Sequence, residues 1–234
     1  AVTDVLDLTG GTGNVGLGSG NLGTALTTGT DNVAIGEASL DAVTTGSDNT
    51  VVGDNAGGAL TTGGNNVAIG SGALLVATTA ADNTAVGTLA LTANSSGTDN
   101  TAVGYAAGDA VTTGDANTFV GDNAGGATTT ADNNTAVGAS ALLVSTTGHS
   151  NAAVGKDALV ANTTGYSNTS LGAHTLIANT TGNNNTAVGR YGLYANTTGG
   201  SNVAVGLQAL FAATTADNNV SIGYQSMLAN TTGA

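Results

Sequence analysis

Aspartates that recur 17 residues apart are the residues best suited to ligate a metal ion. They form two pairs, Asp31 with Asp48 and Asp82 with Asp99. If residues 17 apart lie on neighbouring strands, the carboxylates of a pair are about 5 Å apart and could bind Ca²⁺ weakly. The alternative is that each is a turn residue bonded to the local backbone, which is favoured because Asn65 takes the same place in another copy. We therefore expect no metal site and no cofactor.

The two histidines are the other residues with acid–base chemistry. His149 and His174 are not separated by a multiple of 17, so they fall at different places of the repeat and do not form a dyad. Serine and aspartate are common by composition, so a triad assembled from them would be coincidental. The sequence predicts a protein that is not an enzyme.

Several asparagines match the acceptor pattern for N-linked glycosylation because Thr-Thr or Ser-Ser follows them. The Thr-rich turns could also carry O-linked sugars. Since the matches recur with the repeat itself, they support modification only weakly. The possible sites are Asn94, Asn162, Asn179, Asn196 and Asn230.

Aromatic residues gather in the last third of the chain, which holds five of the seven. Two interpretations are open: a contact patch for a ligand or subunit, or the filling of a wider core. The five residues are Tyr166, Tyr191, Tyr194, Phe211 and Tyr224.

All of these residues belong to a short repeat, seen most clearly as Asn-Thr-Ala-Val-Gly at 185–189. Its glycine returns once after 18 residues and then after 17 residues in every later copy. A short repeat without drift indicates units that cannot bury an apolar face alone and must stack on their neighbours. The marker glycines are Gly18, Gly36, Gly53, Gly70, Gly87, Gly104, Gly121, Gly138, Gly155, Gly172, Gly189, Gly206 and Gly223.

We number each copy from its Asn (position 1), so that the marker glycine is position 5. Position 2 is mostly Thr or Val, position 3 Ala, position 4 Val, Ile or Leu, position 9 mostly Leu, and positions 13 and 14 Thr. This pattern disfavours a helix and fits short strands at positions 2–4 and around 8–13. We predict an all-β fold, a parallel β-solenoid (β-roll) of about thirteen 17-residue rungs. Residues 1–13 form a partial first rung and 14–234 a single solenoid domain.

Three features should hold the rungs together. Asparagine at position 1 predicts a ladder of stacked amides. Positions 4 and 9, as in Val188 and Leu193, should form a thin core that narrows where position 9 is glycine, and Gly189 should supply the positive φ of a corner. Members of the predicted ladder are Asn66, Asn83, Asn100, Asn134 and Asn185.

Composition excludes some partners. Fifteen acids face only Lys156 and Arg190, for a net charge of −13. Nucleic acids and anionic membranes both need a basic face, so neither is an expected partner. No apolar run approaches the roughly 20 residues of a membrane span, so we expect no membrane insertion by this segment.

The thin core predicts association between copies of the chain. Two large apolar side chains per rung contribute roughly 3–6 kcal/mol, less than the roughly 17–34 kcal/mol needed to order the backbone of 17 residues. The last copy ends at Ala234 without a polar capping segment, which predicts a piece of a longer chain or end-to-end stacking. We therefore expect self-association, as a homotrimer or a head-to-tail polymer.

Four stretches resemble a known family: NTAVG at 185–189, NVAIG at 66–70, NTAVGYAAG at 100–108 and ALVANTTG at 158–165. They are similar to the head repeats of trimeric autotransporter adhesins of the YadA-like kind and to repeats of bacterial and phage fibre proteins. The family core, Asn/Ser-x-Val-Ala-Ile-Gly, is matched at 32–36 as well as at 66–70. The resemblance implies a left-handed β-roll of three chains side by side. It also implies a location outside the cell or on its surface, as an adhesive or structural fibre with a possible host or surface ligand.

An ice-binding β-solenoid is the alternative function. It would present a flat Thr array, and the Thr-Thr pairs at positions 13 and 14 are the regular feature, as at Thr163, Thr180 and Thr197. Because adjacent strand residues point to opposite faces, each pair presents only one outward column. Threonine is also a good strand former, which explains the pairs without ice.

Overall fold

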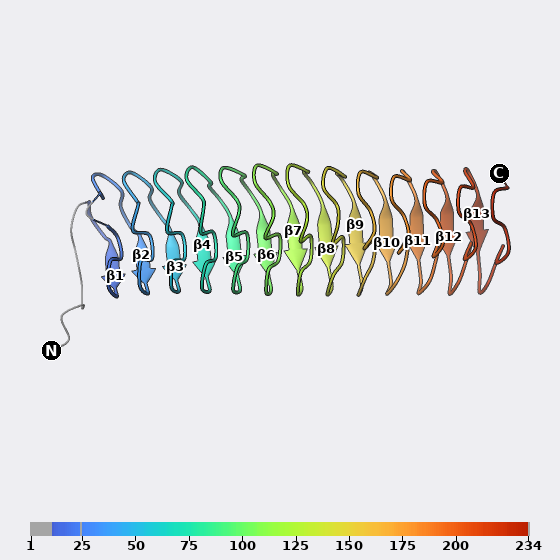
Figure 1. Cartoon of the computed structure of the whole chain (residues 1–234), viewed down its shortest axis with the longest axis horizontal. Helices are drawn as coiled ribbons and strands as arrows, with labels where there is room; N and C mark the ends of the chain where they lie inside the picture. Colours follow the sequence, from blue (N-terminus) through green and yellow to red (C-terminus); the bar gives the residue numbers. More distant parts are fainter. Residues whose placement is uncertain (1–10, 24, 234) are drawn as a thin grey trace. The chain divides into compact units, whose positions relative to one another are not determined.

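The computed structural model of the chain describes residues 11–23 and 25–233. These residues contain no helix and form thirteen three-residue strands, each at positions 2–4 of a copy (Figure 1). The fold is a parallel β-solenoid with a 17-residue rung, as the repeat predicts. The strands are β1 (Val15–Leu17), β2 (Val33–Ile35), β3 (Thr50–Val52), β4 (Val67–Ile69), β5 (Thr84–Val86), β6 (Thr101–Val103), β7 (Thr118–Val120), β8 (Thr135–Val137), β9 (Ala152–Val154), β10 (Thr169–Leu171), β11 (Thr186–Val188), β12 (Val203–Val205) and β13 (Val220–Ile222).

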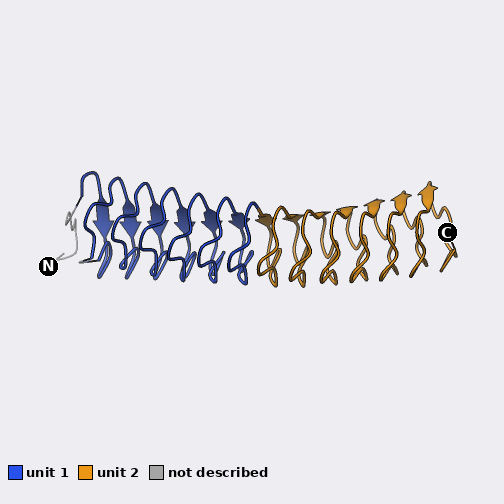
Figure 2. Cartoon of the chain, turned by 90° about the horizontal axis from the view of Figure 1, so that it is seen from above, with its two compact units in different colours: residues 1–116 blue, residues 117–234 orange. Residues whose placement is uncertain are grey.

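Two compact units divide the chain, residues 1–116 (unit 1) and 117–234 (unit 2) (Figure 2). In unit 1, strands β1–β6 pair in parallel in the order of the sequence, and strands β7–β13 do so in unit 2. Within each unit the pairs are in register. Position 4 faces position 4, for example Ile35 with Val52 and Leu171 with Val188.

The structure describes only part of the two predicted segments, 1–13 and 14–234. Of the predicted partial rung over 1–13, only residues 11–13 are described, and Ala234 also lies outside the described residues. The single domain expected over 14–234 stays a prediction.

Beyond each strand the chain forms turns and bends instead of the second strand expected at positions 8–13. Residues at positions 7 and 9 have positive φ, as at Ala38 (50°) and Leu40 (49°), which an extended strand cannot accommodate. Backbone hydrogen bonds to the neighbouring rung continue there, for example from Thr44 N–H to Thr61 O at 2.9 Å. The expectation of a second strand is wrong, but the rungs remain paired around the coil.

Position 3, not position 4, is the core side of each strand. Ala187 at position 3 is 0% exposed, whereas Val188 at position 4 is only half-buried. Because successive strand residues point to opposite faces, burying Ala187 directs Val188 outward. The prediction that position 4 forms the core is therefore wrong. The prediction for position 9 is confirmed by Leu193, which is also 0% exposed.

Asparagines at position 1 form the predicted ladder. Asn185 donates from Nδ2 to Asn168 Oδ1 (3.2 Å) and to Gly199 O (2.8 Å), and its backbone N–H donates to the same Asn168 oxygen (3.0 Å). Each buried amide thus joins two rungs and also closes its own rung at position 15. The Nδ2–Oδ1 bond is repeated by the other predicted members, Asn66, Asn83, Asn100 and Asn134.

Gly189 makes the corner after its strand, as predicted. Its φ is 107°, and a Cβ added there would lie 2.9 Å from the carbonyl carbon and oxygen of Gly206 in the next rung. Both the backbone angle and the close approach of the next rung therefore require glycine.

Two of the three copies with glycine at position 9 have a larger buried side chain where the sequence predicts a narrower core. In the rung of Gly125, Phe119 takes position 3 and is fully buried, and a Cβ on Gly125 would lie 2.5 Å from the Phe119 ring. In the rung of Gly57, Val51 takes position 3 and Leu60 takes position 12, and both are buried. A larger side chain elsewhere in the same rung fills the space that the glycine leaves.

Candidate functional site

The outward side chains at positions 2 and 4 form what we call the sheet face of each unit. Position 4 is apolar throughout, and its side chains are partly solvent-exposed. Ile35 and Ile69 in unit 1 are 37% and 39% exposed, and Leu171 in unit 2 is 48% exposed. Branched apolar residues are usually buried, so an outward column of them is unusual for a surface.

The strand register makes the apolar column continuous. In unit 1, Ile35 pairs with Val52 and Val52 with Ile69. In unit 2, Val188 pairs with Leu171 on one side and with Val205 on the other. Neighbouring side chains of the column are therefore about 4.8 Å apart. Contiguous exposed apolar patches of this kind mark interaction sites.

The sequence reasoning missed the sheet face, although a signal for it was present. In Thr-Ala-Val, alternation puts the small Ala on one side and both larger residues on the other. A coil with Leu at position 9 leaves room only for a small partner at position 3. The alanines at position 3 of most copies therefore indicated that this side of the strand is buried.

The four aspartates considered as metal ligands are turn residues. All have positive φ, between 58° and 60°, and Asn65 and Ser150 adopt the same conformation (59° each) at the equivalent position of other copies. The backbone of this position is bonded between rungs, as from Asp48 N–H to Thr30 O at 3.0 Å. Within residues 11–23 and 25–233, no three His, Cys, Asp or Glu side chains come together as a potential metal site. The aspartates are Asp31, Asp48, Asp82 and Asp99.

The structure gives each histidine its own partners. His149 stacks on Tyr166, with ring centroids 5.2 Å apart. His174 stacks on Tyr191 at 5.5 Å, and its Nδ1 is 3.5 Å from the Asp157 carboxylate. That the chain is not an enzyme stays a prediction.

The asparagines with the glycosylation pattern form a second ladder at position 12 of unit 2. Asn196 donates to Asn179 Oδ1 (2.8 Å) and Asn179 to Asn162 Oδ1 (2.9 Å), and all three are 0% exposed. Each Nδ2 also donates to the glycine carbonyl three residues later. The nitrogens that would carry a sugar are therefore buried and bonded in the folded chain. Asn94 is buried in the same way, and the half-buried Asn230 donates to Gly233 O (3.3 Å).

Threonines at position 13 use their hydroxyls within the coil. Thr163 Oγ1 donates to Thr180 O (3.0 Å), and Thr180 Oγ1 donates to Thr197 O (3.0 Å). The threonines at position 14, such as Thr164 and Thr181, are exposed. One outward threonine column remains, as expected, rather than a plane of two columns.

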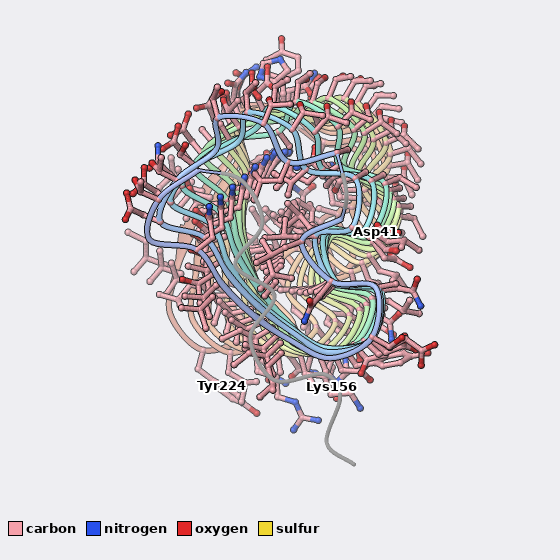
Figure 3. The ribbon with its side chains drawn as sticks, turned by 90° about the vertical axis from the view of Figure 1, so that its left-hand side faces the viewer. Asp41, Lys156 and Tyr224 are labelled. Carbon is pink, nitrogen blue, oxygen red and sulfur yellow. The ribbon has the colours of Figure 1, made fainter. Side chains whose placement is uncertain are left out.

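Three of the five aromatic residues singled out in the sequence meet on the surface of unit 2. Tyr194 and Phe211 stack at 4.9 Å, and the Tyr191 ring meets both edge-on, at 5.5 and 6.5 Å. All three rings are half-buried, so they line the surface instead of widening the core. Tyr166 stacks on His149, as described above, and Tyr224 projects outward from the coil (Figure 3).

Comparison with family models, with curated proteins and with solved structures gives no match. In the described part of the chain, no helix is long and apolar enough to cross a membrane. The geometry of the sheet face and of the aromatic cluster therefore carries the functional argument.

Proposed function

We propose that this chain is a structural and adhesive segment of an extracellular fibre. Its copies associate side by side through the sheet face, as a homotrimer, or end to end as a filament. The observation that supports this is the continuous outward column of Val, Ile and Leu at position 4. It is the same in both units, which fits a surface that is used along the whole of each unit.

The exposed apolar column at position 4 favours association between copies of the chain. Covering a half-exposed Val, Ile or Leu removes apolar surface worth about 1 kcal/mol per side chain. Association costs about 4–15 kcal/mol in lost translational and rotational freedom, and this cost does not grow with the number of rungs. Each rung of every copy adds its own side chain, so a solenoid with many rungs gains more than the fixed cost.

The resemblance to adhesin head repeats and to fibre repeats supports the same proposal. It suggests three chains as the number of copies, a location outside the cell or on its surface, and a surface ligand as partner.

Ice binding remains the second candidate, because the exposed threonines at position 14 form a regular column. The hydroxyls of position 13 are bonded to the next rung, so a single column of available hydroxyls remains. Ice binding predicts thermal hysteresis that is lost when Thr164, Thr181 and Thr198 are replaced by larger residues. A wild-type protein without hysteresis rejects it.

The first test is the native mass by light scattering at several protein concentrations. A mass three times that of the 22.0 kDa chain is expected for the homotrimer, and a mass that grows with concentration for the filament. A monomer at every concentration would reject the proposal.

A pair of double variants tests the surface itself. Leu171→Asp with Val188→Asp places two charges on the sheet face and should reduce the mass to that of the monomer, with the circular dichroism unchanged. The matched control, Thr181→Asp with Thr198→Asp, adds the same charges to the same two rungs at exposed position 14. If the control dissociates the assembly equally, the sheet face is not the interface.

A further inference from the structure

The two cations of the chain lie on one corner of unit 2. Lys156 and Arg190 both occupy position 6, two rungs apart, and both are exposed. Figure 3 shows the Lys156 side chain projecting outward. At the rung spacing of a parallel sheet, the two positions are about 10 Å apart. The chain has a net charge of −13, and both of its cationic side chains lie at this corner.

Tyr191 holds the Arg190 side chain in place. The guanidinium carbon is 4.3 Å from the centre of the Tyr191 ring, and Nη2 donates a hydrogen bond to the Tyr191 hydroxyl. Among the described residues, no carboxylate lies within ion-pair distance of Arg190. The remaining N–H donors of the planar Arg190 guanidinium group are therefore available to an external carboxylate, sulfate or phosphate.

Stacked rings lie beside Arg190. His174 and Tyr191 occupy position 7 of neighbouring rungs and stack at an interplanar angle of 13°. Tyr194 and Phe211, at position 10, stack at 6°. All four residues are half-buried, so the stacked rings line the surface beside Arg190.

Two carboxylates belong to this corner. Asp122 occupies position 6 two rungs before Lys156, the same separation as that between Lys156 and Arg190. Asp157 Oδ2 is 3.9 Å from Lys156 Nζ and 3.5 Å from His174 Nδ1, so it orients both groups and offsets one positive charge. Arg190 remains uncompensated. The same positions in unit 1 carry acids: Glu37 and Asp54 at position 6, and Asp41 and Asp109 at position 10.

We propose that Lys156, His174, Arg190 and Tyr191 form a binding site for an acidic polysaccharide. An anionic group of the sugar binds the Arg190 fork, and a second one approaches Lys156. The Tyr194 hydroxyl and Gln208, whose backbone N–H donates to Arg190 O at 3.1 Å, supply neutral partners for sugar hydroxyls.

The charge pattern favours a sugar polymer over a nucleic acid. Nucleic acids carry a charge on every nucleotide and are bound by many cations, whereas this site has two cations on a strongly acidic chain. A polymer with widely spaced anions and many hydroxyls matches two cations among neutral donors. The site uses positions 6, 7 and 10, so the proposal does not rest on self-association through positions 2 and 4.

Affinity electrophoresis at low salt tests the site with polygalacturonate, dextran sulfate and neutral dextran as immobilised polymers. Retardation by polygalacturonate or by dextran sulfate is expected, and which of the two retards the protein tells whether carboxylate or sulfate is bound. Arg190→Gln should weaken the binding at least about tenfold, because it removes charge-assisted hydrogen bonds. Arg190→Lys should recover only part of it, since Lys lacks the fork.

The matched control is Thr88→Glu, at exposed position 6 of unit 1, which changes the net charge by the same amount as Arg190→Gln. It should bind as the wild type does. No retardation by either acidic polymer, equal loss in the control, or equal retardation by neutral dextran would overturn the proposal. The native mass of each variant is measured in parallel. A monomeric wild type that still binds polymer would reject the proposed assembly and leave this site standing.

Discussion

Unit 1 and unit 2 carry the same residue types at positions 1, 3 and 5 of the rung and different ones at positions 6, 7, 10 and 12. The shared positions make the amide ladder, the buried side of the strand and the glycine corner. Position 12 is mostly Leu, Val or Ala in unit 1, as at Leu60, and mostly Asn, Ser or Thr in unit 2, as at Asn179. The same backbone thus accommodates an apolar or an amide side chain at position 12, provided that the amide is hydrogen-bonded.

The corners differ in charge. Unit 1 has acids at positions 6 and 10 and no cation, whereas unit 2 has both cations at position 6, together with Asp122, and Tyr194 and Phe211 at position 10. The backbone pattern therefore constrains the inner positions and leaves the corners free to differ in charge and in aromatic content. Four predictions test the positions that the two units share and the positions at which they differ.

The largest effect is expected for aspartate at position 3. Ala68→Asp in unit 1 and Ala187→Asp in unit 2 each bury an unpaired charge and should cost about 5 kcal/mol or more. Both should abolish the β signal in circular dichroism, while Val188→Asp at the next residue should keep it. A folded Ala187→Asp variant beside an unfolded Ala68→Asp variant would show that position 3 does not have the same role in the two units.

The compensation between positions 3 and 9 gives the next effect. Phe119→Ala should destabilise the chain by about 3–5 kcal/mol, because it leaves a cavity. Adding Gly125→Leu restores the Ala-and-Leu pairing of other rungs, and Leu142 shows that leucine accepts this backbone, with a φ of 54°. Urea unfolding should therefore find the double variant more stable than Phe119→Ala alone. If the second change adds further destabilisation, the two positions do not share one space.

Removing one amide of the position-12 ladder should have a smaller effect. Asn179→Ala takes away the acceptor of Asn196 and the donor to Asn162 and Gly182. The expected loss is about 1–3 kcal/mol, the cost of unsatisfied buried polar groups. Thermal unfolding of this variant and of Thr181→Ala, at an exposed position of the same rung, provides the comparison. Equal effects would mean that the ladder contributes no stability.

The smallest effect is expected at Thr128, whose buried hydroxyl has no hydrogen-bond partner among the residues that the structure describes. Position 12 is valine in two rungs of unit 1, so Thr128→Val should be neutral or raise the stability by up to about 1 kcal/mol. Thr130→Val, at an exposed position of the same rung, should leave Tm unchanged. A clear loss of stability in Thr128→Val would indicate a partner for the hydroxyl.

Much of the fold could be predicted from the sequence because the interactions repeat. The 17-residue period predicts stacked rungs. An asparagine at position 1 of every copy predicts that its amide bonds to the asparagine of the neighbouring rung. Gly189 was predicted because a glycine in every copy indicates a backbone constraint. Leu193 was placed in the core because position 9 is a large apolar residue in most copies.

Two parts of the fold were predicted wrongly, and both for reasons of space. Val188 is more apolar than Ala187, so hydrophobicity favoured burying it, but the narrow coil has room only for the smaller side chain. Leucine at position 9 suggested a strand, but its backbone turns into the left-handed region, which local propensity disfavours. Tertiary burial outweighed local preference in both cases.

The candidate sites show the same division. The aromatic residues of unit 2 were recognised from composition, but His174 and Arg190 were not linked to them, because their approach depends on the coil. The asparagines at position 12 matched a modification pattern, and the structure placed them in a ladder instead. A motif of three residues carries no information about burial.

By itself the sequence determined the period, the parallel stacking of rungs and the amide ladder, because each depends only on identical residues meeting at a fixed spacing. The tertiary structure alone decided which side of each strand is buried, since that depends on the volume left inside the coil. It also decided which corner residues meet, since a contact between side chains on neighbouring rungs depends on the direction in which each leaves the backbone.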